Sequence, residues 1–299
     1  IVADNAGGVI VTGNSKSTAN KSEYTTIKYN PNGQQTAINR HSLSSFGFDK
    51  ATSIKRESGG IVYVTGAAYD SSNTNRNIKT IKFNSILNPQ WVKEYKGSNN
   101  DNSGNAIDLD VNGDVYVAGH STNSNGIKET VILKYASNGT EQWIRKQPAP
   151  NDFENSEGQK IVAGNQGDVY VTGKTIHNNL SEFFTARYNT QGVKEWEKYF
   201  KSNSGSIDIP LDLKNIADEI LVTGKTATGS IVKYVTVKYR EFKRLIDPAY
   251  GNSGQPSYIK NEIIVGFHRN AMLQNSYNYS TKIQFGTLNQ FVKPDVIDS

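Results

Sequence analysis

The sequence predicts an all-β fold, a β-propeller of four-stranded antiparallel blades, on the basis of three observations. A short apolar strand ending in glycine recurs five times, and a second motif ending in Lys or Arg and an aromatic residue recurs in step with it. A Trp follows the second motif at a fixed distance in three copies. Two motifs that stay in register over five copies indicate a structural repeat of about 50 residues. Four short strands with turn signals at that period are typical of a propeller blade.

The glycine motif marks the second strand of each blade. Its copies end at Gly13, Gly66, Gly119, Gly173 and Gly224, with spacings of 53, 53, 54 and 51 residues. In the third copy Val115 and Val117 alternate with Tyr116, so one set of side chains is expected to face one neighbouring blade and Tyr116 the other. The glycine is expected to allow a close approach of backbone or a positive φ.

The third repeat serves as the model for the remaining elements. Its predicted strands are Ala106–Asp110, Asp114–His120, Lys128–Tyr135 and Thr140–Lys146. Its predicted turns are Asn112-Gly113 and Ser137-Asn138-Gly139, and Ser121–Gly126 is predicted to be a surface loop. Asn-Gly flanked by alternating apolar residues is the strongest short-range signal for a hairpin turn.

The repeats predict the organisation of the whole chain. Blades are expected at approximately 1–49, 50–102, 103–153, 154–205 and 206–250, followed by a linker at 251–257 and the start of a separate small α+β or extended segment at 258–299. Five repeats are expected to form part of a larger ring, because familiar rings have about six to eight blades.

Composition narrows the function classes. The 33 basic and 28 acidic residues are interspersed, so the net charge of +5 provides no dedicated nucleic-acid tract. No run approaches the ~18 apolar residues of a membrane-spanning helix. The absence of Cys removes disulfides and thiolate sites. We expect no nucleic-acid partner and no membrane span.

The third repeat, Asp110–Gly119 followed by Lys134-Tyr135 and Trp143, resembles the SBBP repeat of bacterial β-propellers over residues 1 to about 250. The resemblance implies an exported protein, extracellular or at the cell surface, frequently from Bacteroidota, in which the propeller has no assigned catalytic role. The tail from Asn261 through Pro294 resembles propeptide-like regions of secreted proteins of that phylum, which are associated with type IX secretion and the outer membrane.

Few residues carry recognisable chemistry. His120 and His177 each follow the second strand of a blade and could line a common rim, and Lys82, Lys134 and Arg187 belong to a cation position that recurs once per blade. These five are the candidate ligand-facing residues, weighed against solvated or ion-paired side chains. The sequence predicts no catalytic residue, no metal ligand and no cofactor. Asp108 and Asp208 are candidates for an axial carboxylate pair on equivalent positions of first strands.

These observations predict a non-catalytic binding or spacer module, not an enzyme, that contacts a protein partner or a cell-surface glycan. One alternative is a polysaccharide-acting hydrolase or lyase with an axial active site. Another is a subunit of an outer-membrane or secretion assembly. A deep axial pocket lined by several acidic residues or a metal would favour the enzyme, and a plugged or apolar axis would favour the module.

Overall fold

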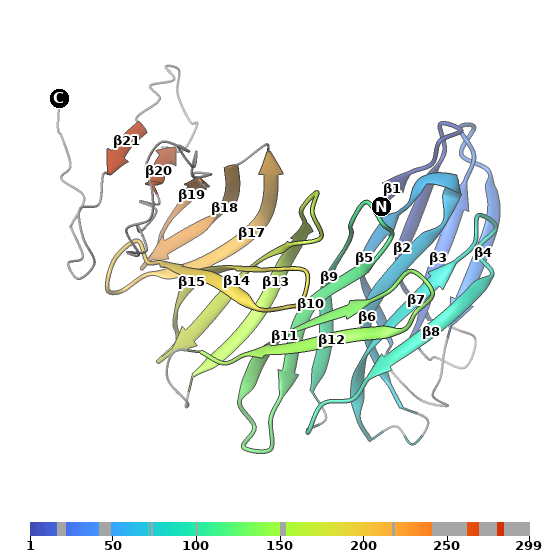
Figure 1. Ribbon diagram of the computed structural model, residues 1–299, viewed down its shortest axis with the longest axis horizontal. Coiled ribbons are helices and arrows are strands. Elements are labelled where there is room, and N and C mark those ends of the chain that lie inside the picture. Colours follow the sequence, from blue (N-terminus) through green and yellow to red (C-terminus); the bar gives the residue numbers. More distant parts are fainter. Residues whose placement is uncertain are drawn as a thin grey trace, which may run out of the picture.

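The computed structural model describes residues 1–16, 22–41, 49–70, 72, 74–99, 101–149, 154–216, 219–240, 262–268 and 280–283. The predicted all-β fold of four-stranded antiparallel blades is confirmed, since the strands of each repeat pair antiparallel in chain order. The first three repeats form separate sheets, and a parallel bridge between Ser181 and Ile207 joins the fourth and fifth repeats into one nine-stranded sheet. The sheets stand as successive blades about a common axis (Figure 1). No helix within the described ranges is long and apolar enough to cross a membrane.

The first four blades share one strand order. The strands of the first blade are β1 (Val2–Ala3), β2 (Val9–Lys16), β3 (Ser22–Tyr29) and β4 (Gln35–His41). Those of the second are β5 (Lys50–Arg56), β6 (Val62–Tyr69), β7 (Arg76–Phe83) and β8 (Pro89–Tyr95). The third has β9 (Asn102–Leu109), β10 (Val115–Thr122), β11 (Lys128–Tyr135) and β12 (Glu141–Gln147). The fourth has β13 (Asn155–Ala163), β14 (Val169–His177), β15 (Leu180–Tyr188) and β16 (Lys194–Phe200).

The fifth blade draws a strand from the tail. It contains β17 (Ile207–Ile216), β18 (Glu219–Thr228) and β19 (Ile231–Arg240), and β20 (Glu262–His268) pairs antiparallel with β19. A short strand, β21 (Ser280–Ile283), pairs with β20. Part of the predicted separate segment 258–299 therefore lies on the edge of the fifth blade, and the predicted linker 251–257 lies outside the described residues.

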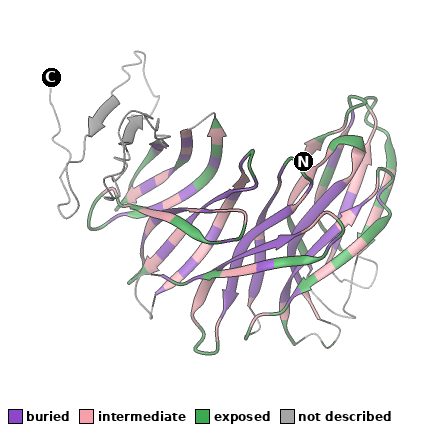
Figure 2. Cartoon of the chain, in the orientation of Figure 1, coloured by how far each residue is buried: buried purple, intermediate pink, exposed green. Residues whose placement is uncertain are grey.

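The apolar core lies between blades rather than within one sheet. Val115 and Val117 pack with Tyr63 of the second blade. Tyr116, on the opposite face of β10, packs with Val169 of the fourth blade. This is the alternation that the sequence predicts, and Figure 2 shows the buried residues running along the strands of neighbouring sheets. Complete burial of one such Val stabilises the fold by about 1.5–3 kcal/mol.

The recurring Trp joins consecutive blades. Trp143 is 8% exposed, and its indole N–H donates a hydrogen bond of 3.0 Å to the carbonyl oxygen of Thr190 in the next blade. Its ring lies against Gly192, where an added Cβ would approach Trp143 Cδ2 to 2.8 Å. Trp91 repeats the arrangement by donating to the Ser137 carbonyl oxygen at 3.1 Å. The predicted burial of Trp143 between blades is confirmed.

Candidate functional site

Each of the last four blades carries a β-bulge on its first strand, opposite the recurring glycine. In β9, Gly104 pairs with Gly119 and Ala106 pairs with Ala118, so Asn105 is an extra residue without a partner. The bulged residues of the second to fifth blades are Thr52, Asn105, Gln159 and Leu211. A bulge bends its strand and redirects a side chain. Here the same position is redirected in four blades.

The bulge explains why glycine recurs. A Cβ added to Gly119 would collide with the Ser103 carbonyl oxygen of β9, and one added to Gly173 would collide with the Glu157 carbonyl oxygen of β13. Of the two predicted reasons for this glycine, close approach is therefore the correct one, because its φ is not in the positive region. Gly13 has no atom within 4 Å of an added Cβ, and the register of β1 with β2 covers only Val9 and Ile10.

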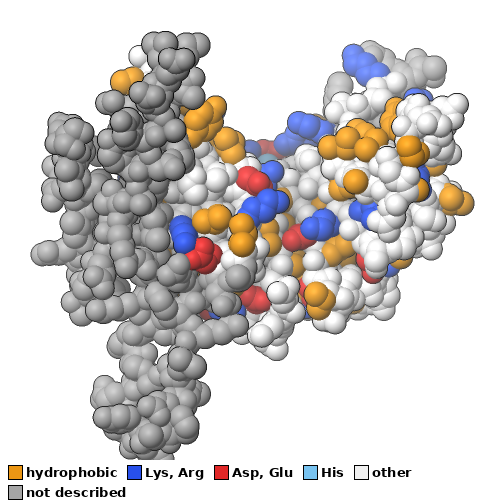
Figure 3. All heavy atoms as spheres, turned by 90° about the horizontal axis from the view of Figure 1, so that it is seen from above, with side chains coloured by type: hydrophobic (Ala, Val, Ile, Leu, Met, Phe, Trp, Pro, Cys, Tyr) orange, Lys and Arg blue, Asp and Glu red, His pale blue; other side chains and the backbone are white. Residues whose placement is uncertain are grey.

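The four bulged residues converge on one pocket at the axis, because first strands of consecutive blades lie next to one another. The axial pocket has a volume of about 460 Å³ and is lined by Thr52, Asn105, His120, Lys128, Glu157, Gln159, Lys160, Pro210 and Leu211. Its volume lies within the range of about 300–1,000 Å³ that small-molecule sites occupy. Figure 3 shows the hollow between the blades, with acidic and basic side chains gathered in it.

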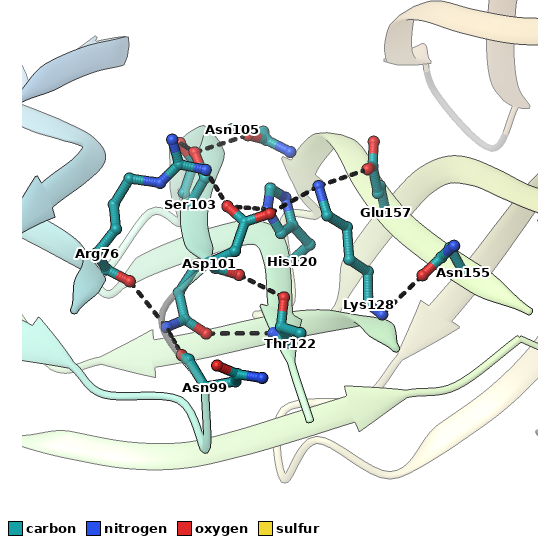
Figure 4. A network of polar contacts seen from close by, with 12 residues as sticks. Arg76, Asn99, Asp101, Ser103, Asn105, His120, Thr122, Lys128, Asn155 and Glu157 are labelled. Atoms are coloured by element: carbon teal, nitrogen blue, oxygen red, sulfur yellow. Dashed lines mark hydrogen bonds and ion pairs between the residues drawn. The ribbon is translucent and has the colours of Figure 1, made fainter. Parts of the chain in front are cut away.

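A charged network crosses three blades at this pocket (Figure 4). Lys128 Nζ at the start of β11 lies 3.0 Å from Asp101 Oδ2 and 3.2 Å from Glu157 Oε1 of β13. Arg76 of β7 pairs with Asp101 from the other side. Lys174 of β14 holds the second oxygen of Glu157 at 3.2 Å. Two carboxylates and three cations thus fix the ends of β7, β9, β11 and β13 relative to one another.

His120 lies beneath this network. Its Nε2 is 3.6 Å from Asp101 Oδ1, and neither ring nitrogen has a hydrogen-bond partner among the described residues. Burial, followed by the charge of Lys128, lowers the pKa of His120 to about 4. The imidazole is therefore neutral at pH 7. Burial alone would raise the pKa of Glu157, but the ammonium groups of Lys174 and Lys128 outweigh it and the net pKa is lowered.

Of the candidate ligand-facing residues, only His120 lines the axial pocket. The side chain of His177 is 63% exposed at the end of β14, with Nδ1 at 2.8 Å from Glu154 Oε1. Lys82 lies over the Tyr63 ring, with Nζ 5.2 Å from its centroid, and donates to the Ser137 carbonyl oxygen. Their ligand role remains a prediction.

Lys134 and Arg187 make contacts of the same kind. Lys134 Nζ lies 5.1 Å from the centroid of the Tyr116 ring and 3.0 Å from Asp114 Oδ2. The Arg187 guanidinium lies 5.6 Å from the centroid of the Tyr170 ring and pairs with Asp168. In the second, third and fourth blades the repeated cation thus lies over the tyrosine directly opposite it in the second strand. Such contacts stabilise a fold by about 0.5–2 kcal/mol each.

The expected carboxylate pair Asp108 and Asp208 does not form. Asp108 is opposite Tyr116 in β10, whereas Asp208 is opposite Thr226 in β18, so the two positions are not equivalent in their blades. Asp108 pairs with Lys55, and Asp208 accepts hydrogen bonds from Ser202 and Ser206. Within the described ranges, no three His, Asp or Glu side chains gather closely enough to hold a metal ion.

Asp101, Lys128, Glu157 and the bulged residues were not among the candidate residues predicted from the sequence. A signal for the bulge was present, because the bulged residue precedes the glycine by 14 positions in three blades and by 13 in the fifth. No comparable signal marks the charged residues. They lie at different positions of their repeats, and only the packing of blades brings them together.

No family model matches the sequence, and no curated protein matches it. Two solved structures are similar in fold. One is an endo-arabinase from Bacteroides thetaiotaomicron, with a TM-score of 0.38, 13% identity, and coverage of 82% of this chain and 97% of that chain. The other is a thermostable family-43 glycoside hydrolase, with a TM-score of 0.40, 13% identity, and coverage of 86% and 98%. The coarse likeness is that of propeller-like repeats of four-stranded sheets.

The prediction that the chain is a non-catalytic binding or spacer module, and not an enzyme, is contradicted. The similar solved structures are an endo-arabinase and a family-43 glycoside hydrolase, and at 13% identity their likeness to this chain concerns the fold alone. The axis is also neither plugged nor apolar, because it contains a pocket lined by His120, Lys128 and Glu157.

Proposed function

We propose that this chain acts on a polysaccharide and that the axial pocket is its active site. The observation that carries the proposal is the pair of carboxylates, Asp101 and Glu157, which come from different blades and share the ammonium of Lys128. Each has one oxygen within hydrogen-bonding distance of that ammonium, so these two oxygens are at most about 6 Å apart. Retaining glycoside hydrolases use two carboxyl groups about 5–5.5 Å apart, one as acid and base and one as nucleophile, and this bound is compatible with that separation.

The two carboxylates differ in the roles they suit. Glu157 has a lowered pKa, which keeps it ionised as a base or nucleophile. Arg76 and Lys128 both favour the ionised form of Asp101, so Asp101 would act as the proton donor once bound substrate displaces a cation from it. The neutral imidazole of His120 lies beside its Oδ1. A substrate oxygen that displaces the Lys128 ammonium from Asp101 would raise the proton affinity of that carboxyl group.

The exposure of the side chains at the pocket favours cleavage of the polysaccharide by hydrolysis over cleavage by elimination. Elimination from a sugar acid needs a base that reaches a carbon-bound proton, and both ring nitrogens of His120 are buried. The side chains of Asp101 and Glu157 are 35% and 15% exposed, so water and substrate can reach them. Glu157 lines the pocket and Asp101 adjoins it through Lys128, whereas the His120 imidazole lines the pocket with both of its nitrogens buried.

The test is release of reducing ends from a panel of polysaccharides by the purified chain. We expect Glu157→Gln and Asp101→Asn each to lower the rate by about 100-fold or more. Glu141→Gln is the control, because Glu141 is exposed on β12 and away from the pocket. The proposal is wrong if the chain cleaves no member of the panel, or if the two variants, shown by circular dichroism to be folded, keep the full rate.

We further propose that the chain is exported, as the likeness of its repeat to the SBBP repeat implies, and meets its polysaccharide outside the cell or at the cell surface. A protein partner or membership of a larger surface assembly is compatible with this location. Fractionation of the producing cells, with an antibody against this chain, tests the location. Retention in the cytoplasmic fraction would contradict it.

A further inference from the structure

We propose that the axial pocket recognises an anionic sugar unit and that Lys160 contacts its acidic group. The inference rests on the proposed function of the same pocket and specifies the class of substrate. The ligand is a polysaccharide that carries carboxylate or sulfate groups, which share the chemistry that an ammonium recognises.

The charges at the pocket do not balance within the protein. Arg76, Lys128 and Lys174 are all engaged by Asp101 or Glu157. Lys160, a fourth cation, forms no ion pair with a described residue, although its side chain lines the pocket. His120 is uncharged near pH 7 and does not change the sum. The pocket and its network therefore hold two more positive than negative side chains.

The repeat shows that this cation is particular to the fourth blade. Lys160 follows the bulged residue of β13 directly, and the residues at this position in the other bulged blades are Ser53, Ala106 and Asp212. The fold therefore does not require a lysine there. The adjacent Gln159 also makes no hydrogen bond with a described residue, so its amide can bind a sugar hydroxyl or an acidic oxygen.

The fifth blade supplies an apolar wall to the same pocket. Pro210 and Leu211 of β17 line it, and Leu211 is 46% exposed. A sugar ring has apolar C–H faces and polar edges, so a wall of this kind beside a free ammonium and a free amide suits a charged sugar. Small-molecule sites generally combine an apolar lining with a few placed polar groups.

The experiment compares ligands that differ only in charge. Calorimetry measures binding of an oligogalacturonate and of the same oligomer with its carboxyl groups methyl-esterified, and dextran sulfate is compared with dextran. We expect the acidic oligomer to bind at least 10-fold more tightly than its ester, and the preference to weaken at high salt. We expect Lys160→Gln to abolish the preference and Lys160→Arg to keep most of it.

Lys214→Gln is the matched control, because Lys214 is an exposed lysine of a first strand outside the pocket. A preference that falls equally in Lys160→Gln and Lys214→Gln would overturn the inference, as would equal binding of acid and ester. Tighter, Lys160-dependent binding of dextran sulfate would support it with sulfate as the acidic group.

The outcomes separate this inference from the proposed function. Cleavage confined to neutral polysaccharides would leave the proposed function standing and overturn the anionic substrate. Lys160-dependent binding of the acidic oligomer without any cleavage in the panel would support the anionic ligand and contradict the enzymatic function.

Discussion

Replacing Gly119 by Ala tests whether the β-bulges organise the axis. A Cβ at this position would lie well inside 3.0 Å of the Ser103 carbonyl oxygen, closer than real Cβ contacts come. The first strand must therefore move by roughly 1.5 Å to restore ordinary contact, and overpacking of this kind costs about 1–3 kcal/mol. Loss of a bulge hydrogen bond adds about 1 kcal/mol. We expect Gly119→Ala to lower the free energy of unfolding by about 2–4 kcal/mol.

Gly13→Ala provides the matched control in the same repeat position. No atom lies within 4 Å of its added Cβ, and its φ is not in the positive region. The substitution restricts only the unfolded chain, which stabilises a protein by about 0.4–1 kcal/mol.

Urea unfolding followed by Trp fluorescence measures both variants, since the Trp side chains lie at the junctions between blades. A free energy of unfolding for Gly119→Ala that lies within about 0.5 kcal/mol of the unchanged protein would refute the role of the bulge, because such a difference is typical of neutral surface substitutions. This role is also refuted if the two alanine variants are equally destabilised. A displaced bulge also moves Asn105, whose side chain donates a hydrogen bond of 2.8 Å to the Gly158 carbonyl oxygen of the next blade.

Three further predictions concern packing and charge. Trp143→Ala is expected to cost about 3–5 kcal/mol in urea unfolding, and a loss below about 1 kcal/mol would show that the ring does not join the blades. Tyr116→Phe is expected to cost about 1–2 kcal/mol, because the buried hydroxyl lies 3.1 Å from Asp110 Oδ2 and 3.0 Å from the Gly167 carbonyl oxygen of the next blade; an unchanged unfolding midpoint would contradict this. The pKa of His120 is about 4 in the folded protein and about 6.5 for an exposed imidazole, so the unfolded chain binds its proton first as the pH falls. The free energy of unfolding therefore falls between about pH 6.5 and pH 4 by on the order of 2–3 kcal/mol, and we expect His120→Gln to lose correspondingly less over this range. An equal loss in the variant would show that another group causes it.

Local patterns along the chain were sufficient to predict the blades. Alternation around Tyr116 indicated two buried faces, and the Asn112-Gly113 signal located the hairpin between the first and second strands. The predicted two-residue turn is wrong in detail, because Leu109 pairs with Val115 and the Gly113 N–H donates to the Asp110 carbonyl oxygen at 3.1 Å, with Gly113 at a φ of 78°. These features depend on neighbours within one sheet or on one adjacent blade. A repeat reveals such neighbours because each copy has the same surroundings.

The fifth blade was less predictable for a related reason. Its outer strand, β20, comes from residues beyond the repeat, and pairing with β19 is a long-range event. No motif in Glu262–His268 matches the outer strands of the other blades, so the sequence indicated a strand without indicating its partner.

The sequence by itself determined the repeat, the strand order within a blade and the packing role of Trp143, because these follow from periodicity. Only the tertiary structure decided the site. Asp101, Lys128 and Glu157 occupy different repeat positions in the third and fourth blades, and they meet because rotation about the axis brings the ends of β9, β11 and β13 together. The packing of blade on blade therefore pairs charged residues that lie far apart in the chain. It leaves Lys160 without an ion-pair partner among the described residues.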